Sequence, residues 1–177
     1  MLDGMYLQNI ANVLQLSGKL DYQKFSDKLC YGYERARTYV FDALPPESSS
    51  YREKKQRFLD RLSYLDKFQV ELGYVKDEGR TCPICQKHIL IPRQKKVDIL
   101  IATRLMECSY DDRLDKIILV AGDGDFVPAV QIAKKNKEIA LAFAEGGSVG
   151  VATELKKAVD RRIRLDRGYF DDCRMMG

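Results

Sequence analysis

The feature that most restricts the fold of this chain is the segment Lys116–Val127, KIILVAGDGDFV. Its apolar residues Ile117–Val120 follow a charged residue and run almost up to Gly122. An uninterrupted apolar run of this length is typical of a strand that is buried on both faces of a parallel sheet. Ligands of open α/β sheets bind beyond the carboxyl ends of such strands, which is where Asp123 and Asp125 stand.

The two aspartates of this segment flank Gly124 in a turn that has no basic residue close to it in the sequence. Like charges at this spacing repel and raise one another's pKa unless a cation lies between them. We therefore interpret Asp123 and Asp125 as part of a divalent-metal site. The alternative interpretation is a solvated turn in which Asp125 stands near the N-cap of the following helix.

Predicted strands and helices alternate along the chain, and this order indicates an α/β fold with a mostly parallel central sheet. Strand patterns cover residues 37–44, 117–120, 138–143 and 162–165. Helical patterns cover residues 6–16, 22–31, 51–72, 97–108, 126–135 and 151–159, and Ser17-Gly18 ends the first of these helices. In the helix predicted over 51–72, Phe58, Leu62, Leu65 and Phe68 form the buried stripe, and Lys55 is among the basic residues on or near the exposed side.

Composition places the chain among soluble proteins with one domain. It has 177 residues, of which 45% are hydrophobic and 32% are charged. It has no run of 18 apolar residues and no secretion signal at its start, so we expect no membrane span and a cytoplasmic location. Five dispersed cysteines then predict thiols or metal ligands and not disulfides. The net charge of +4 is compatible with a polyanionic partner.

A cysteine-containing insert over residues 73–96 interrupts the domain, which we place at 1–166 with a C-terminal tail at 167–177. We interpret the insert as a β-excursion or an irregular segment. Cys82, Cys85 and His88 have the spacing of zinc ligands. A closed zinc site needs a fourth ligand, for which the candidates are a second subunit, as in a homodimer, or one of Cys30, Cys108 and Cys173. The alternative is a tight turn with two inert thiols.

Two further aspartates are candidates for the site at Asp123 and Asp125. Asp3 stands where a first strand of the sheet would end, although that strand is curtailed or absent, and Asp98 begins the helix at 97–108. Because an α/β fold brings the ends of different elements to one sheet edge, we expect these four carboxylates to be catalytic and to bind a metal ion. Oxygen ligands suit Mg²⁺ or Mn²⁺, and such an ion activates water to attack a phosphodiester. Each of Asp3 and Asp98 is, alternatively, an ordinary aspartate at a helix start.

Candidate contacts to a nucleic acid surround these carboxylates in the sequence. Tyr6 is a candidate for stacking on a base, and Ser148, in the loop 145–150, is a candidate for contacting phosphate at a helix N-terminus. Basic residues that precede Asp98 are candidates for holding a phosphate backbone, namely Arg80, Arg93, Lys95 and Lys96. All of these residue types also occur as ordinary surface or core residues.

Four stretches of the chain, in matching order, resemble the NYN family of PIN-like nuclease domains, in particular its LabA-like branch. The most specific one is Val120-Ala-Gly-Asp-Gly-Asp-Phe126, which resembles an S-G-D-x-D-F signature. The others are Asp3-Gly4 with Tyr6-Leu7, Lys95-Lys-Val-Asp98, and Ser148–Leu155 with Asp160. The resemblance implies a three-layer α/β/α sandwich and metal-dependent cleavage of RNA, with acidic residues binding Mg²⁺ or Mn²⁺. We expect single-stranded RNA as the partner.

The chain departs from the family pattern at two positions. Arg104 stands six residues after Asp98, where the family usually carries another aspartate, and Met5 replaces an asparagine that usually follows D-G. Arg104 could pair with a site carboxylate and weaken metal binding. We therefore keep a second hypothesis, a catalytically weakened RNA-binding or regulatory module with the same fold. A third, a phosphatase with Asp123 as nucleophile, is disfavoured because only about 50 residues follow Asp125.

Overall fold

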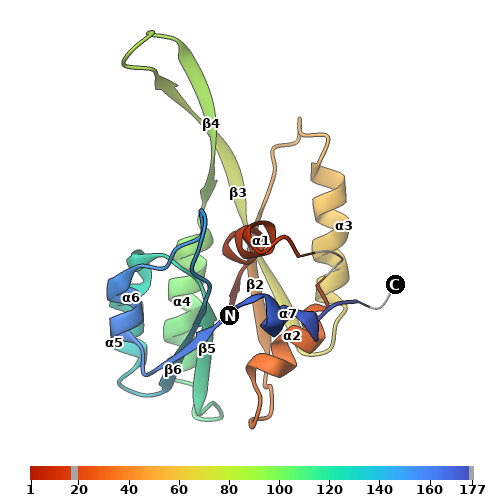
Figure 1. Ribbon diagram of the computed structural model, residues 1–177, viewed down its shortest axis with the longest axis vertical. Helices are drawn as coiled ribbons and strands as arrows, with labels where there is room; N and C mark the ends of the chain where they lie inside the picture. Colours follow the sequence, from red (N-terminus) through yellow and green to blue (C-terminus); the bar gives the residue numbers. More distant parts are fainter. Residues whose placement is uncertain (17–19, 176–177) are drawn as a thin grey trace.

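The computed structural model describes residues 1–16 and 20–175, and within them the chain forms a seven-stranded sheet with helices on both faces (Figure 1). The strand order is β4-β3-β2-β1-β5-β6-β7. Neighbouring strands are parallel except for β4, which is antiparallel to β3. The strands are β1 Leu2–Asp3, β2 Thr38–Leu44, β3 Phe68–Thr81, β4 His88–Lys95, β5 Lys116–Val120, β6 Glu138–Phe143 and β7 Arg161–Arg164. The predicted α/β fold with a mostly parallel sheet is confirmed.

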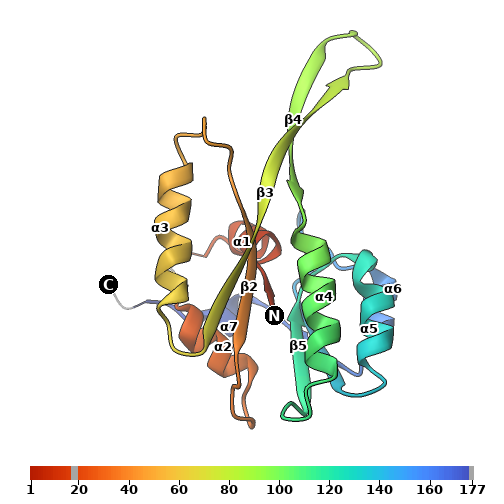
Figure 2. The ribbon, with the colours of Figure 1, turned by 180° about the vertical axis from the view of Figure 1, so that it is seen from behind.

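The helices form the two outer layers of the fold; α1 to α6 lie between strands in the chain, and α7 follows the last strand. α1 lies in front of the sheet in Figure 1, whereas α4 lies in front of it when the molecule is seen from behind in Figure 2. α4 packs on β2, β3 and β5 and also on α5. The helices are α1 Gly4–Val13, α2 Tyr22–Leu29, α3 Arg52–Ser63, α4 Val97–Ser109, α5 Val127–Ala133, α6 Thr153–Ala158 and α7 Arg167–Asp171, with a 3₁₀ turn, η1, at Gly124–Phe126.

The core lies where the central strands meet the helices. β5 and β6 read as continuous apolar runs because both of their faces are covered, and Leu119 and Leu141 are fully buried. α4 contributes Ile101 and Leu105 to this core, and α5 contributes Val130. Truncating such a side chain to alanine removes about 2–5 kcal/mol of stability, so this core fixes the strand ends that carry the candidate site.

The predicted strands at 138–143 and 117–120 match β6 and all but the first residue of β5, whereas the helix predicted over 51–72 is confirmed only as far as Ser63. α3 ends at Ser63, Lys67 adopts a positive φ of 60°, and Phe68 begins β3 beside Thr38. Leu65 and Phe68 continue the helical spacing only by coincidence, because pairing with β2 overrides local pattern. α1 ends at Val13, and the predicted stop at Ser17-Gly18 lies outside the described residues.

The two ends of the chain join the sheet and the helical layers in different ways. β1 has only two residues, which lie between β2 and β5. The tail forms α7, whose Phe170 ring stacks on Phe25 with 5.3 Å between ring centroids. Among the described residues, no helix is both long enough and apolar enough to span a bilayer.

The segment predicted as a β-excursion is the β3–β4 hairpin, which projects away from the domain body (Figure 1). Its two strands pair from Tyr74 with Lys95 at the base to Thr81 with His88 near the tip. The inner half of β3 is part of the main sheet through β2, and the outer half pairs with β4. The hairpin base therefore stands beside the start of α4, where Asp98 is located.

Candidate functional site

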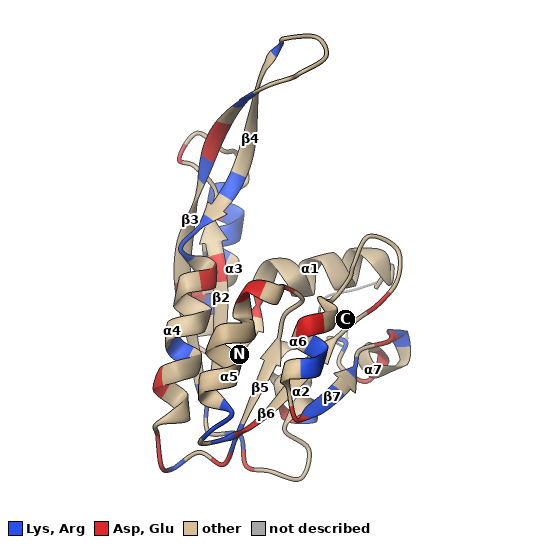
Figure 3. Ribbon diagram, turned by 90° about the vertical axis from the view of Figure 1, so that its left-hand side faces the viewer, with Lys and Arg blue, Asp and Glu red and all other residues tan. Residues whose placement is uncertain are grey.

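A polar groove of about 750 Å³ brings the four predicted aspartates together. It is lined by Asp3 at the end of β1, Asp98 in the first turn of α4, and Asp123 and Asp125 after β5. Figure 3 shows acidic residues gathered near the beginnings of α1, α4 and α6, below the base of the hairpin. The groove thus lies at the carboxyl ends of the parallel strands, as the topology requires.

Asp3 is held in place as the N-cap of α1. Its Oδ1 accepts hydrogen bonds from the backbone N–H groups of Met5, at 3.0 Å, and Tyr6, at 3.1 Å. Burial raises the pKa of Asp3 to about 6; the hydrogen bond from Tyr6 opposes the rise, and the charge of Asp98 adds to it. The helix start therefore fixes a carboxylate whose pKa is well above that of an ordinary aspartate.

Asp98 and the aspartate pair after β5 affect one another electrostatically. Partial burial raises the pKa of Asp98, and the negative charges of Asp123 and Asp125 raise it further. Asp123 caps η1, with its Oδ1 accepting from the N–H of Asp125 at 2.9 Å. The aspartate that caps this turn is therefore Asp123. The fold thus brings the start of α4 and the turn after β5 close enough for their negative charges to repel one another.

The donor chemistry of the groove fits a hard divalent cation, although the carboxylates do not converge on one point. Within residues 1–16 and 20–175, no three His, Cys, Asp or Glu side chains form a group that could hold a metal ion. Oxygen donors and mutual repulsion are what Mg²⁺ or Mn²⁺ would relieve. Binding would require exposed side chains such as Asp98, Asp123 and Asp125 to turn toward Asp3, which is fixed by its cap.

Glu154 and Asn9 are polar groove residues that the sequence analysis did not identify. Glu154, in the first turn of α6, lines the groove, and its carboxylate lies against Gly124. Asn9 lines the groove from α1. The position of Glu154 could have indicated its role. It stands in the first turn of the helix after β6, and β6 also ends at this edge of the sheet.

A buried ion pair beneath the groove was also missed. Asp42 in β2 and Lys55 in α3 are both buried, and Oδ2 of Asp42 lies 2.6 Å from Nζ of Lys55. The prediction that Lys55 lies on or near the exposed side of its helix is therefore wrong. Asp42 also accepts from the N–H of Ala43 at 2.7 Å, and its charge contributes to the raised pKa of Asp3. Gly4 is needed beside it, because a Cβ at that position would meet the Asp42 carboxylate.

Arg104 does not pair with the groove carboxylates. Its guanidinium contacts Glu71 at 2.6 Å and Glu107 at 2.8 Å, and it lies 4.9 Å from the ring centre of Tyr39. The sequence suggested that Arg104 could pair with a carboxylate of the site. It pairs instead with Glu71 in β3 and with Glu107 in α4. Arg104 is not among the residues that line the groove.

The predicted RNA contacts divide into two sets. Arg93 and Ser148 line the groove and are exposed. Lys95 pairs with Glu78 on the hairpin, and Lys96 lies 5.4 Å from the ring centre of Tyr74. Neither lysine is among the lining residues, and Arg80 is farther out on β3.

Tyr6 lies in the groove wall and is not free to stack on a base. Its side chain is only 9% exposed, and its ring packs against Gly122. Its hydroxyl lies 3.3 Å from both the carbonyl oxygen and the amide nitrogen of Ala144. Tyr6 therefore holds α1 against the end of β6, and the prediction of base stacking is corrected.

The predicted zinc residues lie at the hairpin tip, away from the groove. The Cys82 sulfur accepts hydrogen bonds from the backbone N–H groups of Cys85 and Ile84 and interacts with the Cys85 thiol, which together lower the pKa of Cys82. His88 is turned toward the strands, with Nδ1 3.3 Å from Oγ1 of Thr81 and Nε2 close to Gly79. The tip thus presents a pair of sulfurs and no third ligand among the described residues.

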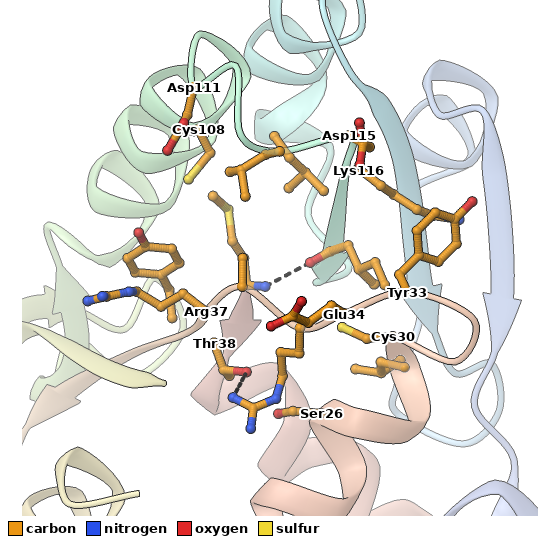
Figure 4. A pocket seen from close by; sticks show the side chains of 18 of the residues that line it. Ser26, Cys30, Tyr33, Glu34, Arg37, Thr38, Cys108, Asp111, Asp115 and Lys116 are labelled. Carbon is orange, nitrogen blue, oxygen red and sulfur yellow. Dashed lines mark hydrogen bonds between the residues drawn. The ribbon is translucent and has the colours of Figure 1, made fainter. Parts of the chain in front are cut away.

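The remaining cysteines lie in the domain body and do not complete a site at the tip. Cys30 and Cys108 line a second pocket of about 410 Å³ at the amino ends of β2 and β5 (Figure 4), and Cys173 is buried beneath α7. In this pocket the Met1 amino group donates to the carbonyl oxygen of Ile118 at 2.7 Å, and burial lowers the pKa of that amine to about 6. The suggestion that a body cysteine supplies the fourth zinc ligand is therefore wrong.

The strand order and the helices on both faces of the sheet define an α/β protein with a PIN-like fold. The sequence matches the NYN domain over residues 2–166, which is most of the chain. The protein belongs to the NYN family, a family of PIN-like nuclease domains.

Comparison with solved structures supports this fold. The crystal structure of a protein of unknown function from Vibrio parahaemolyticus RIMD 2210633 matches with a TM-score of 0.56 and 20% sequence identity, over 93% of this chain and 90% of that one. At this identity the likeness concerns the fold alone. A comparison with curated protein sequences found no match.

Proposed function

We propose that this protein is a metal-dependent endoribonuclease of the LabA-like branch, which hydrolyses phosphodiester bonds in single-stranded RNA with Mg²⁺ or Mn²⁺. The observation that carries the proposal is the convergence of Asp3, Asp98, Asp123 and Asp125 on one groove from three separate segments. Two of these carboxylates have a raised pKa, caused by burial and by the charges of their neighbours. Structural aspartates seldom accumulate in this way without a cation to offset them.

The groove residues have two proposed roles, which are metal binding and contact with the RNA. The four aspartates would hold the ion, which when bound activates water and offsets charge on the phosphate. Arg93 and Ser148 both line the groove and are exposed, so Arg93 would supply a cation for a neighbouring phosphate and Ser148 a hydroxyl donor. Because Asp3 has a pKa of about 6, it must release a proton before it can act as a ligand at lower pH.

The groove's shape is consistent with an extended single strand. It is open and lined by polar side chains, and the hairpin base borders it through Pro92 and Arg93. Recognition of single strands without sequence preference depends on positive charge along the groove, which Arg93 and a bound cation would supply here. The walls offer no free aromatic ring at Tyr6, so contacts to the phosphate backbone would dominate.

The direct test is cleavage of a fluorescently labelled single-stranded RNA in Mn²⁺, with the unaltered chain compared with Asp123→Asn. We expect cleavage by the unaltered chain and a loss of about 100-fold or more in the variant, because ligand loss exceeds the 10–100-fold typical of outer-shell changes. Asp112→Asn is the matched control, since Asp112 is exposed and is not among the residues lining the groove. Equal cleavage by the unaltered chain and Asp123→Asn would implicate a contaminating nuclease.

The second hypothesis is an RNA-binding or regulatory module that has lost its chemistry. It rested on Arg104, which the structure places against Glu71 and Glu107. The same assay separates the two hypotheses when RNA binding is measured in parallel. Binding of RNA in Mn²⁺ with no cleavage by the unaltered chain would favour the module over the enzyme.

A further inference from the structure

The outer half of the β3–β4 hairpin lacks the packing that supports the rest of the molecule. Near the tip, Ile84 is 92% exposed and Leu90 is 66% exposed, and Ile89 is also exposed. Figure 1 shows the hairpin extending beyond the helices on both faces of the sheet. An isolated two-stranded hairpin is at best marginally stable in water, so this segment calls for a ligand or a partner.

The turn at the tip is closed by backbone hydrogen bonds and holds Cys82 and Cys85. The N–H of Cys82 donates to the carbonyl oxygen of Lys87 at 2.9 Å, and the N–H of Gln86 donates back to the carbonyl oxygen of Cys82 at 2.9 Å. Gln86 adopts a positive φ of 55°, which closes the turn. Cys82 and Cys85 therefore lie on one closed turn, in the Cys-x-x-Cys spacing by which a single turn supplies two ligands to a structural zinc ion.

The tip is two ligands short of a closed zinc site. Structural zinc is almost always held by four ligands in a tetrahedron. Cys82 and Cys85 supply two, His88 is turned back onto the strands toward Thr81, and the other cysteines lie in the body. Within residues 1–16 and 20–175 no third metal ligand accompanies the pair.

We propose that Cys82 and Cys85 are half of a tetrathiolate zinc site, which a second copy of this chain completes with its own hairpin tip. Two identical halves of two ligands each make a closed tetrahedral site on a two-fold axis. Zinc binding forms four Zn–S bonds and releases one proton from each thiol that was still protonated. The assembly is independent of the carboxylate groove and of the reaction proposed there.

Charge and apolar area at the tip fit this occupant. A zinc ion with four thiolates carries two net negative charges, and each tip places Arg80 and Lys87 close to its cysteines in sequence. These four basic groups would offset that charge across the interface. Ile84, Ile89 and Leu90 would lose water-exposed apolar surface as two tips approach.

The test is to measure zinc content and molar mass on the whole chain, purified with reductant and titrated with Zn²⁺ alone. We expect 0.5 zinc per chain and a dimer, which a zinc chelator converts to monomer. Cys85→Ser should abolish both zinc uptake and dimerisation, whereas Cys30→Ser, the control thiol in the body, should retain both. Circular dichroism checks that each variant is folded, and Co²⁺ in place of zinc should give the absorption of a tetrahedral thiolate site.

Three results would overturn the proposal. One zinc per monomeric chain that is lost in His88→Ala would make the site a local one with His88 as a ligand. A dimer that survives the chelator but is broken by reductant would be an intermolecular disulfide. Absence of zinc uptake in the folded, reduced chain would leave the two cysteines as ordinary thiols.

Discussion

The acidic groove and the hairpin tip are candidate metal sites of opposite construction. The groove draws Asp3, Asp98, Asp123 and Asp125 from distant segments, and it exists only when the sheet has formed. The tip draws Cys82 and Cys85 from one turn, and it projects away from the core. The pKa of Asp3 is raised by burial, whereas that of Cys82 is lowered by local N–H groups. Folding therefore brings the carboxylates of the groove together at a cost in stability. At the hairpin tip, local hydrogen bonds favour the thiolate form of Cys82.

The largest expected effect concerns the buried ion pair between Asp42 and Lys55 and its contribution to the free energy of unfolding. Lys55→Met should lower the free energy of unfolding by about 3–5 kcal/mol, because it leaves the buried Asp42 carboxylate without its partner. Urea denaturation measures this difference. The matched control is Lys54→Met, since Lys54 is exposed and its removal should change stability by no more than about 0.5 kcal/mol. Similar losses in both variants would mean that the ion pair contributes nothing specific.

The next effect separates the two sites by function. Asp98→Ala should reduce RNA cleavage in Mn²⁺ by about 100-fold, since it removes a proposed ligand from the groove. Cys85→Ser should leave cleavage per chain unchanged, because the tip is far from the groove and chemically independent of it. Single-turnover kinetics at saturating protein measure both. A comparable loss in Cys85→Ser would show that the tip supports the groove directly.

A smaller effect measures what the groove costs the fold. The pKa of Asp3 rises from 3.8 to about 6 on folding, so the folded state holds its proton more tightly than the unfolded state. Stability from this group is therefore full below pH 3.8 and is lost as pH rises to about 6. Asp3→Asn keeps an acceptor for the α1 cap and removes the charge, so it should be more stable by about 2 kcal/mol at pH 8.

The measurement for Asp3→Asn is urea denaturation at a series of pH values. The difference between the variant and the unaltered chain should grow between pH 4 and pH 6 and should vanish below pH 4. A difference that does not change with pH would mean that burial does not disfavour the Asp3 carboxylate.

The smallest effect concerns the tip in the absence of metal. Ile84→Ser should change the free energy of unfolding of the metal-free chain by no more than about 0.5 kcal/mol, because Ile84 is almost fully exposed. Leu119→Ala, in the core beneath the groove, should lower it by about 2–5 kcal/mol. Thermal or urea denaturation compares the two. A large loss in Ile84→Ser would mean that the tip is packed even without a partner.

Prediction from sequence succeeded where local pattern and tertiary structure agree. The apolar run at Ile117–Val120 and the strand over 138–143 were predictable because both of their faces are buried. The convergence of four aspartates followed from the rule that parallel strands end at one edge. The helix predicted over 51–72 extends too far, because Phe68 continues the helical spacing while its backbone pairs with β2.

Side-chain partners were the part that the sequence could not supply. Lys55 stands among basic residues on a charged helix, and nothing local indicates that it reaches the buried Asp42. Arg104 was expected near the groove, but its direction depends on where β3 places Glu71. Tyr6 was expected to be free to stack on a base, but it packs against the end of β6, where its hydroxyl donates to the carbonyl oxygen of Ala144. These outcomes depend on contacts between segments far apart in the chain.

The central claim is that the groove binds a divalent cation through its aspartates, and a crystal soaked in Mn²⁺ tests it most directly. Anomalous scattering should show manganese in the groove, in contact with carboxylate oxygens of the four aspartates, with the side chains of Asp98, Asp123 and Asp125 turned toward Asp3. A well-diffracting soaked crystal with no manganese peak in the groove would contradict the claim and leave the protein with the NYN fold but without the proposed chemistry.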